Sequence, residues 1–210
     1  MNKINSIPEL TLKRLPLYLS YLKTLPKDAP SNISATAIAA DLEINDVQVR
    51  KDLAALGDGG RPKIGYIVEE LINEIENCLG YRDAHSAALV GVSDLGRALL
   101  CYDGFCDFGM NIVVAFDKNK ELVGTQINGK HILALEKLEN LCERMKTRIG
   151  IITAPAEEAQ EICDILVYAG AIAIWNFTTS KLNVPADVMV LNEHIEESIP
   201  ILTRYVEDTI

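Results

Sequence analysis

The chain has 210 residues, of which 49% are hydrophobic and 24% are charged, a composition typical of a globular protein with one large domain or two modest ones. No run approaches the roughly 18 to 20 apolar residues that cross a bilayer. The N-terminal residues also lack the apolar segment of a secretory signal. We therefore expect a soluble cytoplasmic protein that makes no membrane contact.

The net charge of −10 is unevenly distributed along the chain. Residues 1–66 carry nine Lys and Arg against seven Asp and Glu, whereas residues 67–210 carry eleven against twenty-three. Residues 1–66 are thus mildly basic and the rest of the chain is acidic, which indicates that only residues 1–66 contact phosphates.

The five cysteines indicate neither a disulfide framework nor a zinc site, because they are odd in number and form no C-x-x-C pair. We expect each to be a small buried hydrophobic side chain. They are Cys78, Cys101, Cys106, Cys142 and Cys163.

The first predicted element is an amphipathic helix after Pro8. Pro16 either weakens this helix or lies near its start. Apolar side chains at spacings of three and four form its stripe: Leu12, Leu15, Leu19 and Leu22.

Two short helices joined by a tight turn are predicted next. Ser34 is a favourable N-cap for a helix through about Leu42, and Asn45 for a second helix with the sequence DVQVRKDLAAL. Residues 43–45 form the turn between them. This arrangement has the geometry of a helix-turn-helix, whose second helix enters the major groove of DNA.

Residues 57–68, GDGGRPKIGYIV, are predicted to form a wing beside the helix-turn-helix. The glycines and the proline exclude a helix, and Ile64, Tyr66 and Val68 alternate as in a short β-ribbon. A helix over residues 69–79 then links two domains.

From residue 86 onward, apolar strands alternate with helices. AALVGV, NIVVAFD, RIGIIT and AIAIWNF are predicted strands, whereas LGRALLCY and residues 156–169 are predicted helices. This alternation is typical of a parallel sheet covered on both faces. A last amphipathic helix carries Ile195, Ile199, Leu202 and Val206 on one side.

The segment GVSDLG, residues 91–96, follows a predicted strand and opens a helix, as the dinucleotide fingerprint G-x-G-x-x-G requires. Gly91 permits the tight turn, Gly96 lets the helix pack on the strand, and the helix N-terminus holds a pyrophosphate. Asp117 ends the next strand, where a carboxylate accepts from a ribose 2′-hydroxyl and repels a 2′-phosphate. The pattern therefore favours NAD(H) over NADP(H).

Ser93 stands where the fingerprint has its middle glycine. Either the loop binds nucleotide with altered contacts, or a Rossmann-like domain has kept its fold and lost the ligand. Catalysis is not indicated, because His85, His131 and His194 do not supply a general acid or base beside a nicotinamide. We predict a binding protein and not an enzyme.

The second short helix is expected to bury Val49, Leu53 and Leu56, so that the polar side chains on its other side face outward. Arg can read guanine, and Lys can pair with phosphate. The alternative is a solvated basic face, which the adjoining wing disfavours. The side chains predicted to contact DNA are Gln48, Arg50 and Lys51 on this helix, Arg61, Lys63 and Tyr66 on the wing, and Lys13 and Arg14 on the first helix.

Four runs together resemble the Rex family of redox-sensing transcriptional repressors, and they cover essentially the whole chain. They are VQVRKDL with the glycine-rich wing ending in GY, LVGVSDLGRALL with Asp117 downstream, ITAPAEEAQEICDILVYAGAIAIWNF, and NVPADVMV before the terminal helix. The resemblance implies an α/β fold: a winged helix-turn-helix domain over 1–80, a Rossmann-like NAD(H)-binding parallel-sheet domain over 81–190, and a swapped dimerisation helix over 191–210. It also implies a homodimeric repressor on palindromic operator DNA that is released when NADH replaces NAD⁺.

The resemblance also assigns roles to matching residues. It places Tyr102 near the nicotinamide and Thr153 and Pro155 beside the cofactor. His194 stands where many members have an aspartate and Asp94 where the loop is often basic, which suggests an Asp94–His194 contact of reversed polarity between subunits. The loop positions that match the family's fingerprint are Gly91, Val92, Ser93, Asp94, Leu95 and Gly96.

Three alternatives stay open at this point. The first is a regulator of the same architecture in which Ser93 has abolished or altered NADH sensing. The second is a small NAD-dependent oxidoreductase with an accessory helical domain, and the third is a protein-interaction module with a degenerate winged helix.

Overall fold

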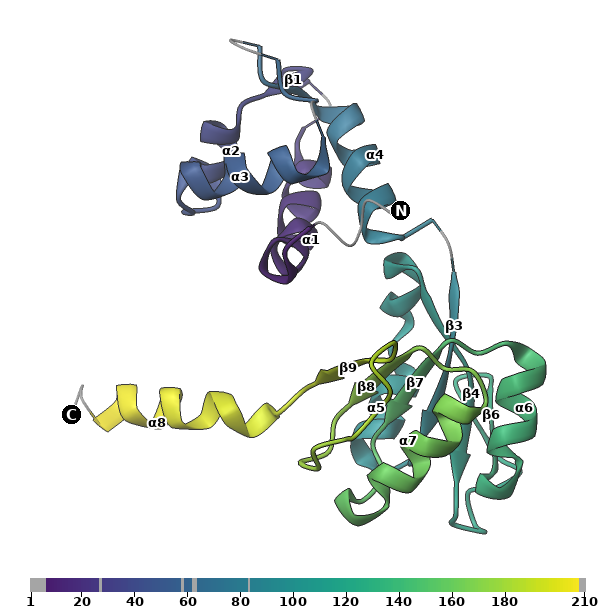
Figure 1. Ribbon diagram of the computed structural model, residues 1–210. Helices are drawn as coiled ribbons and strands as arrows, with labels where there is room; N and C mark the ends of the chain where they lie inside the picture. The colour runs from purple at the N-terminus through teal and green to yellow at the C-terminus, as the bar shows by residue number, and fades with distance from the viewer. Residues whose placement is uncertain (1–6, 27, 58, 62–63, 83, 208–210) are drawn as a thin grey trace. The chain divides into compact units, whose positions relative to one another are not determined.

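The computed structural model describes residues 7–26, 28–57, 59–61, 64–82 and 84–207. The chain divides into two compact units, Met1–Asp83 and Ala84–Ile210. Each unit has its own hydrophobic core. Figure 1 labels helices and strands of both units.

The first unit contains four helices and a short antiparallel ribbon among its described residues. Strand β1 pairs with β2 so that Ile33 lies opposite Tyr66. In chain order the elements are α1 (Glu9–Thr24), β1 (Asn32–Ile33), α2 (Ala35–Asp41), α3 (Asp46–Leu56), β2 (Tyr66–Ile67) and α4 (Val68–Leu79).

The core of this unit combines side chains from all four helices. Three of the four leucines predicted as the stripe of α1 are buried, and Leu12 is half-buried. Pro16 lies inside α1, which begins at Glu9 and continues to Thr24, so the proline neither starts nor ends the helix. The buried core residues are Leu15, Tyr18, Leu19, Leu22, Ile33, Ala35, Ile38, Ala39, Val49, Leu53, Leu71 and Ile75.

The wing is shorter than the alternation of its side chains predicts. Val68 was expected to continue the ribbon, but it is the first residue of α4. Its N–H donates to the carbonyl oxygen of Ser31, the residue before β1 (2.9 Å). The helix that was expected from residue 69 therefore begins one residue earlier.

The second unit contains a seven-stranded sheet in the order β5-β6-β4-β3-β7-β8-β9, in which only β5 and β6 pair antiparallel. The strand order reverses between β3 and β7, and such switch points are where open α/β sheets bind ligands. The strands are β3 (His85–Val90), β4 (Met110–Asp117), β5 (Gln126–Ile127), β6 (Lys130–Ala134), β7 (Ile149–Ile152), β8 (Ala173–Asn176) and β9 (Met189–Asn192).

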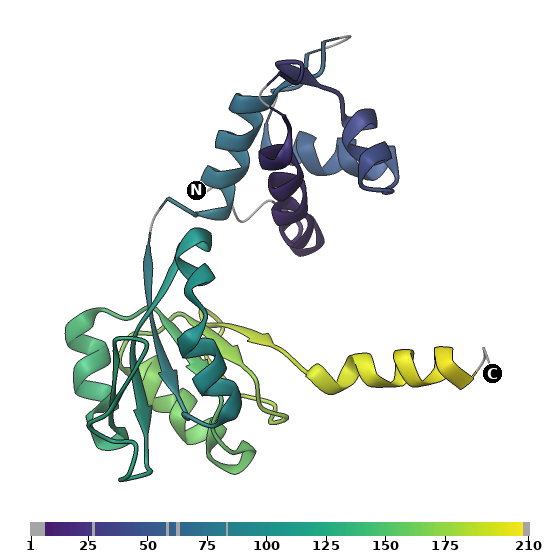
Figure 2. The ribbon, with the colours of Figure 1, turned by 180° about the vertical axis from the view of Figure 1, so that it is seen from behind.

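Helices cover both faces of this sheet, as the alternation predicts. Figures 1 and 2 show α6 and α7 on one face and α5 on the other. Each face has a separate core, one around Phe116 and Leu166 and the other around Leu89 and Leu100. The helical elements are α5 (Asp94–Cys101), η2 (Asp103–Phe108), η3 (Leu135–Lys137), α6 (Leu138–Met145), η4 (Ala156–Glu158) and α7 (Ala159–Tyr168).

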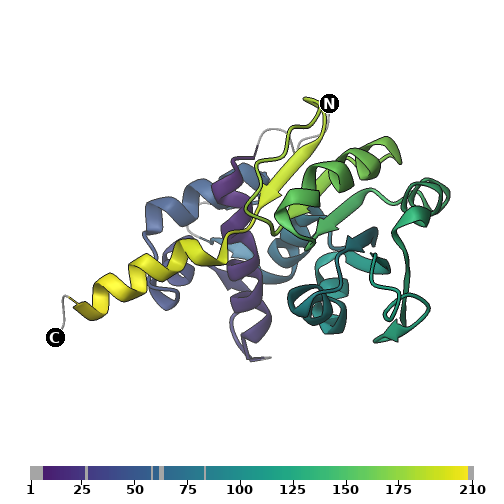
Figure 3. The ribbon, with the colours of Figure 1, turned by 90° about the horizontal axis from the view of Figure 1, so that it is seen from below.

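The chain continues through the 3₁₀ turn η5 (Ile195–Ser198) into α8 (Ile199–Glu207), the yellow helix of Figure 3. None of the described side chains of α8 is buried. In the described part of the chain, no helix has both the length and the apolar character needed to span a bilayer.

The prediction that every cysteine is buried is wrong for two of the five. Cys142 and Cys163 are buried, and burial raises the pKa of each thiol to about 11. Cys101 and Cys106 are exposed, because one ends α5 and the other lies in the turn η2. Cys78 is half-buried.

Candidate DNA interface and nucleotide site

Both helices of the helix-turn-helix begin at a side-chain N-cap, as the sequence predicts. Ser34 Oγ accepts from the N–H of Ala37 (3.0 Å), and Asn45 Oδ1 accepts from the N–H of Val47 (2.9 Å). Glu43, between the helices, has a left-handed φ of 54°. Each helix is therefore fixed at its start by its own cap, and a tight turn separates the two.

A buried carboxylate holds α3 against α1. Asp52 is 1% exposed and accepts from Arg14 Nε (2.6 Å) and Nη2 (2.8 Å). It also accepts from the Tyr18 hydroxyl (2.8 Å), the Thr11 hydroxyl (2.9 Å) and the Gln48 amide (3.0 Å). Burial acts to raise the pKa of Asp52, but these hydrogen bonds outweigh it and lower that pKa to about 2. Burial and then the bond to Asp52 raise the pKa of Tyr18 to about 12.

This network corrects two interpretations of the sequence. Arg14 was predicted to contact phosphate, but its guanidinium makes a two-bond ion pair with Asp52. Gln48 was predicted to point away from the buried face, but it is half-buried and donates to Asp52. Because Arg14 and Asp52 are 38 residues apart, no local pattern reveals the pair.

The remaining predicted cations of the helices lie on the surface. The Arg50 side chain is 61% exposed, and its Nη2 bonds Asp46 (2.9 Å) and the Thr36 hydroxyl (3.1 Å). Exposed ion pairs of this kind contribute little free energy, so a phosphate or a base can replace these partners. Lys51 is exposed, and exposed Lys13 pairs with Glu9 (2.9 Å).

The wing forms a tight backbone turn beside α2. The N–H of Gly65 donates to the carbonyl of Arg61 (2.9 Å). Gly65 has a φ of +84°, and a Cβ there would lie 2.3 Å from the carbonyl oxygen of Ile33, so the ribbon requires glycine at this position. Arg61 is exposed and Tyr66 is half-buried, whereas Lys63 lies outside the described residues.

An open groove extends from the wing to α3. It gathers side chains from the start of α2, from α3 and from the wing, so the predicted DNA contacts of both elements border one surface. Its lining residues are Ser34, Ala35, Thr36, Arg50, Gly60, Arg61, Ile64, Gly65 and Tyr66.

In the second unit, close backbone contacts shape the loop between β3 and α5. Gly91 has a φ of +97°, and a Cβ there would lie 2.5 Å from the backbone nitrogen of Ala154. A Cβ on Gly96 would lie 2.1 Å from the carbonyl oxygen of Gly91, to which the Thr153 hydroxyl donates (2.5 Å). The turn and packing roles predicted for the two glycines are confirmed.

Ser93 precedes α5 but does not cap it. Its hydroxyl donates to the carbonyl oxygen of Thr153 (3.3 Å) instead. The first bond of the helix runs from the N–H of Arg97 to the carbonyl of Ser93 (2.8 Å), so the N–H groups of residues 94–96 have no acceptor within the helix. These donors and the helix dipole favour an anion, and the serine side chain is directed to a different partner. The loop therefore fits a pyrophosphate.

Asp117 lies at the carboxyl end of β4, where the sequence predicts it. Its Oδ2 accepts from the N–H of Val92 (2.6 Å), and its Oδ1 accepts from the N–H of Asn119 (2.7 Å). A carboxylate oxygen can accept more than one hydrogen bond, so a ribose hydroxyl can bond the same group. Asp117 therefore fixes the loop and remains suited to a ribose.

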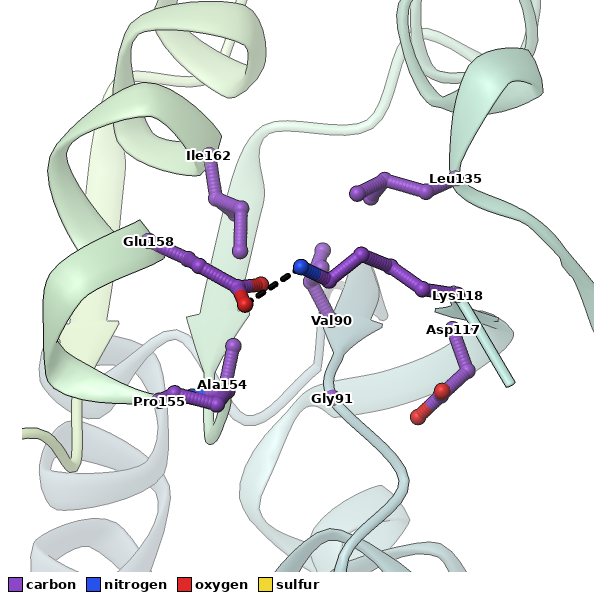
Figure 4. A pocket seen from close by; sticks show the side chains of 9 residues that line it. All are labelled: Val90, Gly91, Asp117, Lys118, Leu135, Ala154, Pro155, Glu158 and Ile162. Carbon is purple, nitrogen blue, oxygen red and sulfur yellow. Dashed lines mark ion pairs between the residues drawn. The ribbon is translucent and has the colours of Figure 1, made fainter.

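A small apolar pocket lies beside this loop, at the carboxyl ends of β3, β4 and β7 (Figure 4). Its apolar walls suit a flat aromatic base. Lys118 and Glu158 reach toward each other across it and form an ion pair. The lining residues are Val90, Gly91, Asp117, Lys118, Leu135, Ala154, Pro155, Glu158 and Ile162.

Tyr102 lies at the opposite end of α5 from the loop, a separation of about 12 Å at 1.5 Å per residue. Its ring packs on Phe105, with centroids 4.9 Å apart, and the row of aromatic rings continues through Trp175 to Phe177. The structure of one chain therefore does not bring Tyr102 to its own loop, because α5 runs back along the sheet.

The other cofactor residues predicted from the resemblance lie in the pocket, at the start of α5 and before η5. Pro155 lines the pocket, and Leu95 is half-buried in the first turn of α5. Asp94 is exposed, and His194 is half-buried before η5. The proposed Asp94–His194 contact joins two subunits, so it stays a prediction.

Among the lining residues that were not predicted from the sequence are Lys118, Leu135, Glu158 and Ile162. Only Lys118 has a local signal, because it follows Asp117 at a strand end. The other three are brought to the pocket by the pairing of β4 with β6 and by the packing of α7 on the sheet.

Family models and relatives match almost the whole chain. Residues 82–180 match a model described as "CoA binding domain", and residues 6–54 match one described as "Putative DNA-binding protein N-terminus". The redox-sensing transcriptional repressor Rex of Bacteroides fragilis is 39% identical over 196 residues, which are 93% of this chain and 89% of that protein. Rex of Treponema denticola is 40% identical, with 91% of each chain covered. This chain belongs to the Rex family.

Solved structures of Rex relatives agree with this assignment. The crystal structure of RSP in complex with NAD⁺ and operator DNA matches with a TM-score of 0.90 at 33% identity, covering 97% of this chain and 94% of that one. RSP in complex with NADH matches with a TM-score of 0.84 at 32% identity, covering 97% and 95%. The predicted fold class, a DNA-binding head followed by a Rossmann-like sheet, is confirmed. The Rex relatives are named as transcriptional repressors, which supports the prediction of a regulator over that of an enzyme.

Proposed function

We propose that this chain is a cytoplasmic DNA-binding repressor that senses the NADH/NAD⁺ ratio, and that NADH binding releases it from a palindromic operator. The observation that carries this proposal is the match to RSP, a Rex-family repressor crystallised both with NAD⁺ and operator DNA and with NADH. The geometry of both candidate sites supports it.

For DNA, the recognition helix is α3. Arg50, which is exposed and lines the groove that leads to the wing, reads a base edge, and exposed Lys51 contacts a phosphate. Arg61 and Tyr66 contact the flanking backbone or minor groove, together with Lys63. Lys13 is a further phosphate contact. Arg14 and Gln48 act indirectly, because they bond the carboxylate that anchors the helix.

For the cofactor, the N–H groups of residues 94–96 hold the pyrophosphate of NAD(H), and Asp117 holds the adenine-side ribose. Thr153 and Gly91 fix the shape of the loop through their hydrogen bond. Pro155 contributes to the wall for the base. The dinucleotide supplies a signal rather than a reaction: its nicotinamide is either oxidised and cationic or reduced and neutral.

The proposed functional unit is a homodimer, with domain limits of 1–80, 81–190 and a swapped helix over 191–210. The exposed apolar side chains of α8 support this exchange, because a lone surface helix does not retain such a set without a partner. Two recognition helices related by a twofold axis then enter successive major grooves about 34–36 Å apart. The exposed residues are Ile199, Ile201, Leu202, Tyr205 and Val206.

The test is binding to a fluorescent palindromic operator at fixed salt across a series of NADH/NAD⁺ ratios. Replacing NAD⁺ by NADH should weaken DNA binding by about 5- to 150-fold, the usual range of allosteric coupling. Trp175, which is the one tryptophan of the chain, reports NADH binding independently through energy transfer to the reduced nicotinamide.

Two variants make this test specific. Arg50→Ala should weaken DNA binding while NADH binding is retained. Lys23→Ala removes an equal charge from α1, where Lys23 pairs with Glu76, and should leave DNA binding nearly unchanged. DNA affinity that does not respond to NADH would favour a regulator with altered sensing. Steady oxidation of NADH by a carbonyl substrate would favour an oxidoreductase.

A further inference from the structure

A single ion pair crosses the pocket beside the nucleotide loop. Lys118 extends from the end of β4, and Glu158 extends from the turn η4 after β7 (Figure 4). The Lys118 side chain is 58% exposed, but the Glu158 side chain is only 23% exposed. Glu158 is also held by the bond from its N–H to the carbonyl of Pro155 (3.0 Å). A cation on one wall is thus held by a partly buried anion on the opposite wall.

The position of Lys118 makes this pair relevant to the choice of dinucleotide. It directly follows Asp117, the residue suited to the ribose 2′-hydroxyl. A basic residue near that hydroxyl is what accommodates the 2′-phosphate of NADP(H) in this type of site. Asp117 disfavours the phosphate, but Lys118 could offset that repulsion if its ammonium were available.

Figure 4 shows that the ammonium of Lys118 points to Glu158 and that the Asp117 carboxylate points away from it, toward the Gly91 loop. Asp117 is held there by the N–H groups of Val92 and Asn119. The two acidic residues therefore have different tasks. Asp117 faces the ribose position, and Glu158 neutralises the one cation that adjoins Asp117 in the chain.

We propose that Glu158 is a specificity-determining residue that excludes NADP(H) by holding Lys118. The inference rests on the proposed binding of NAD(H) at this loop. An incoming 2′-phosphate would have to compete with Glu158 for the ammonium, and the carboxylate and the phosphate would repel each other in the same pocket. A ligand with a plain 2′-hydroxyl meets neither obstacle.

The experiment measures the affinities of NADH and NADPH for the full chain by energy transfer from Trp175. The variants are Glu158→Gln, Lys118→Gln and the double variant. Glu158→Gln should raise the affinity for NADPH relative to that for NADH by about tenfold, the size of one charge-assisted hydrogen bond to phosphate. The double variant should lose this gain, because the freed cation is then absent.

Glu157→Gln is the matched control, since Glu157 lies in the same turn, is exposed, and loses the same charge. Its ratio of NADH to NADPH affinity should stay that of the wild-type chain. Circular dichroism checks that each variant is folded.

The possible failures are distinguishable. If the wild-type chain binds NADH but Glu158→Gln leaves the affinity ratio unchanged, or if the double variant keeps the gain, the role of Glu158 is refuted and the proposed function stands. If Glu158→Gln weakens both ligands equally, the ion pair is only a support for the pocket. If the wild-type chain binds neither dinucleotide, both proposals fail.

Discussion

The helices α3 and α5 are held in place by different kinds of contact: polar side chains hold α3, and close backbone packing holds α5. Helix α3 begins at the Asn45 cap and is anchored by the buried Asp52 carboxylate. Helix α5 begins at Ser93, which does not cap it. Its position depends on the absence of a side chain at Gly96, because this residue lies directly against the carbonyl oxygen of Gly91.

This difference follows from what each helix is proposed to bind. A recognition helix offers its outer side chains to DNA, so its own backbone donors can be satisfied internally. A phosphate-binding helix must keep its first N–H groups open and allow the ligand close to the backbone. If polar anchors support α3 and close packing supports α5, substitutions in the two helices should have different effects.

The largest effect is expected from Asp52→Asn. It leaves the Arg14 guanidinium without its carboxylate and should destabilise the first unit by about 3 kcal/mol, since breaking a buried pair is strongly destabilising. DNA binding should weaken with it, and NADH binding should not change. Chemical denaturation followed by circular dichroism measures the effect, with exposed Asp28→Asn as the control. A loss no greater than that of the control would show that the anchor is unimportant.

The same carboxylate predicts how the first unit responds to acid. Asp52 has a pKa lowered from 3.8 to about 2 in the folded state, so the ionised form is the one that folding favours. Its contribution is complete above pH 3.8 and decreases as the pH falls toward 2. Wild-type stability should therefore decrease more steeply over this interval than that of Asp52→Asn. If the stabilities of the two proteins decreased equally over this pH interval, the proposed role of ionised Asp52 would be contradicted.

A smaller loss of stability is expected from Gly96→Ala. The added Cβ would lie 2.1 Å from a backbone oxygen, so α5 must move, at a cost of about 2 kcal/mol. Because the displaced helix carries the pyrophosphate donors, NADH binding should be lost while the first unit keeps its stability. Ala98→Ser, exposed on the same helix, is the control. Retained NADH affinity in Gly96→Ala would show that α5 tolerates a shift.

Asn45→Ala tests the cap of α3. It removes the acceptor for the Val47 N–H and should cost about 1 kcal/mol, the usual value for an N-cap. The midpoint of denaturation of the first unit should decrease accordingly. No change in that midpoint would mean that tertiary packing alone fixes the start of α3.

The smallest effect is expected from Ser93→Ala. Because Ser93 does not cap α5, the substitution should cost less than about 0.5 kcal/mol, below the range for a lost cap. NADH affinity should also be retained. A loss equal to that of Asn45→Ala would remove the contrast between the two helices.

Local signals in the sequence predicted much of the fold. The caps Ser34 and Asn45, the alternation of strands and helices, and the loop before α5 all depend on neighbouring residues, and each was located correctly. Strands β1, β5, β6 and β9 and helix α6 were not assigned. The apolar runs at residues 132–135 and 188–191 are only four residues long, and so short a run does not distinguish a strand from a helix. The wing was predicted at the correct place in the chain, but its strand comprises only Tyr66 and Ile67. Ile64 lies in a turn, and Val68 belongs to α4.

The sites divide in the same way. The glycine loop, Asp117 and the outward Arg50 and Lys51 could be predicted from the sequence, because turn geometry and helical period are set within a few residues. The ion pairs of Arg14 with Asp52 and of Lys118 with Glu158 could not be predicted. Those partners are brought together by helix packing and sheet order, and a charged side chain has no local preference that tells which distant charge it will meet.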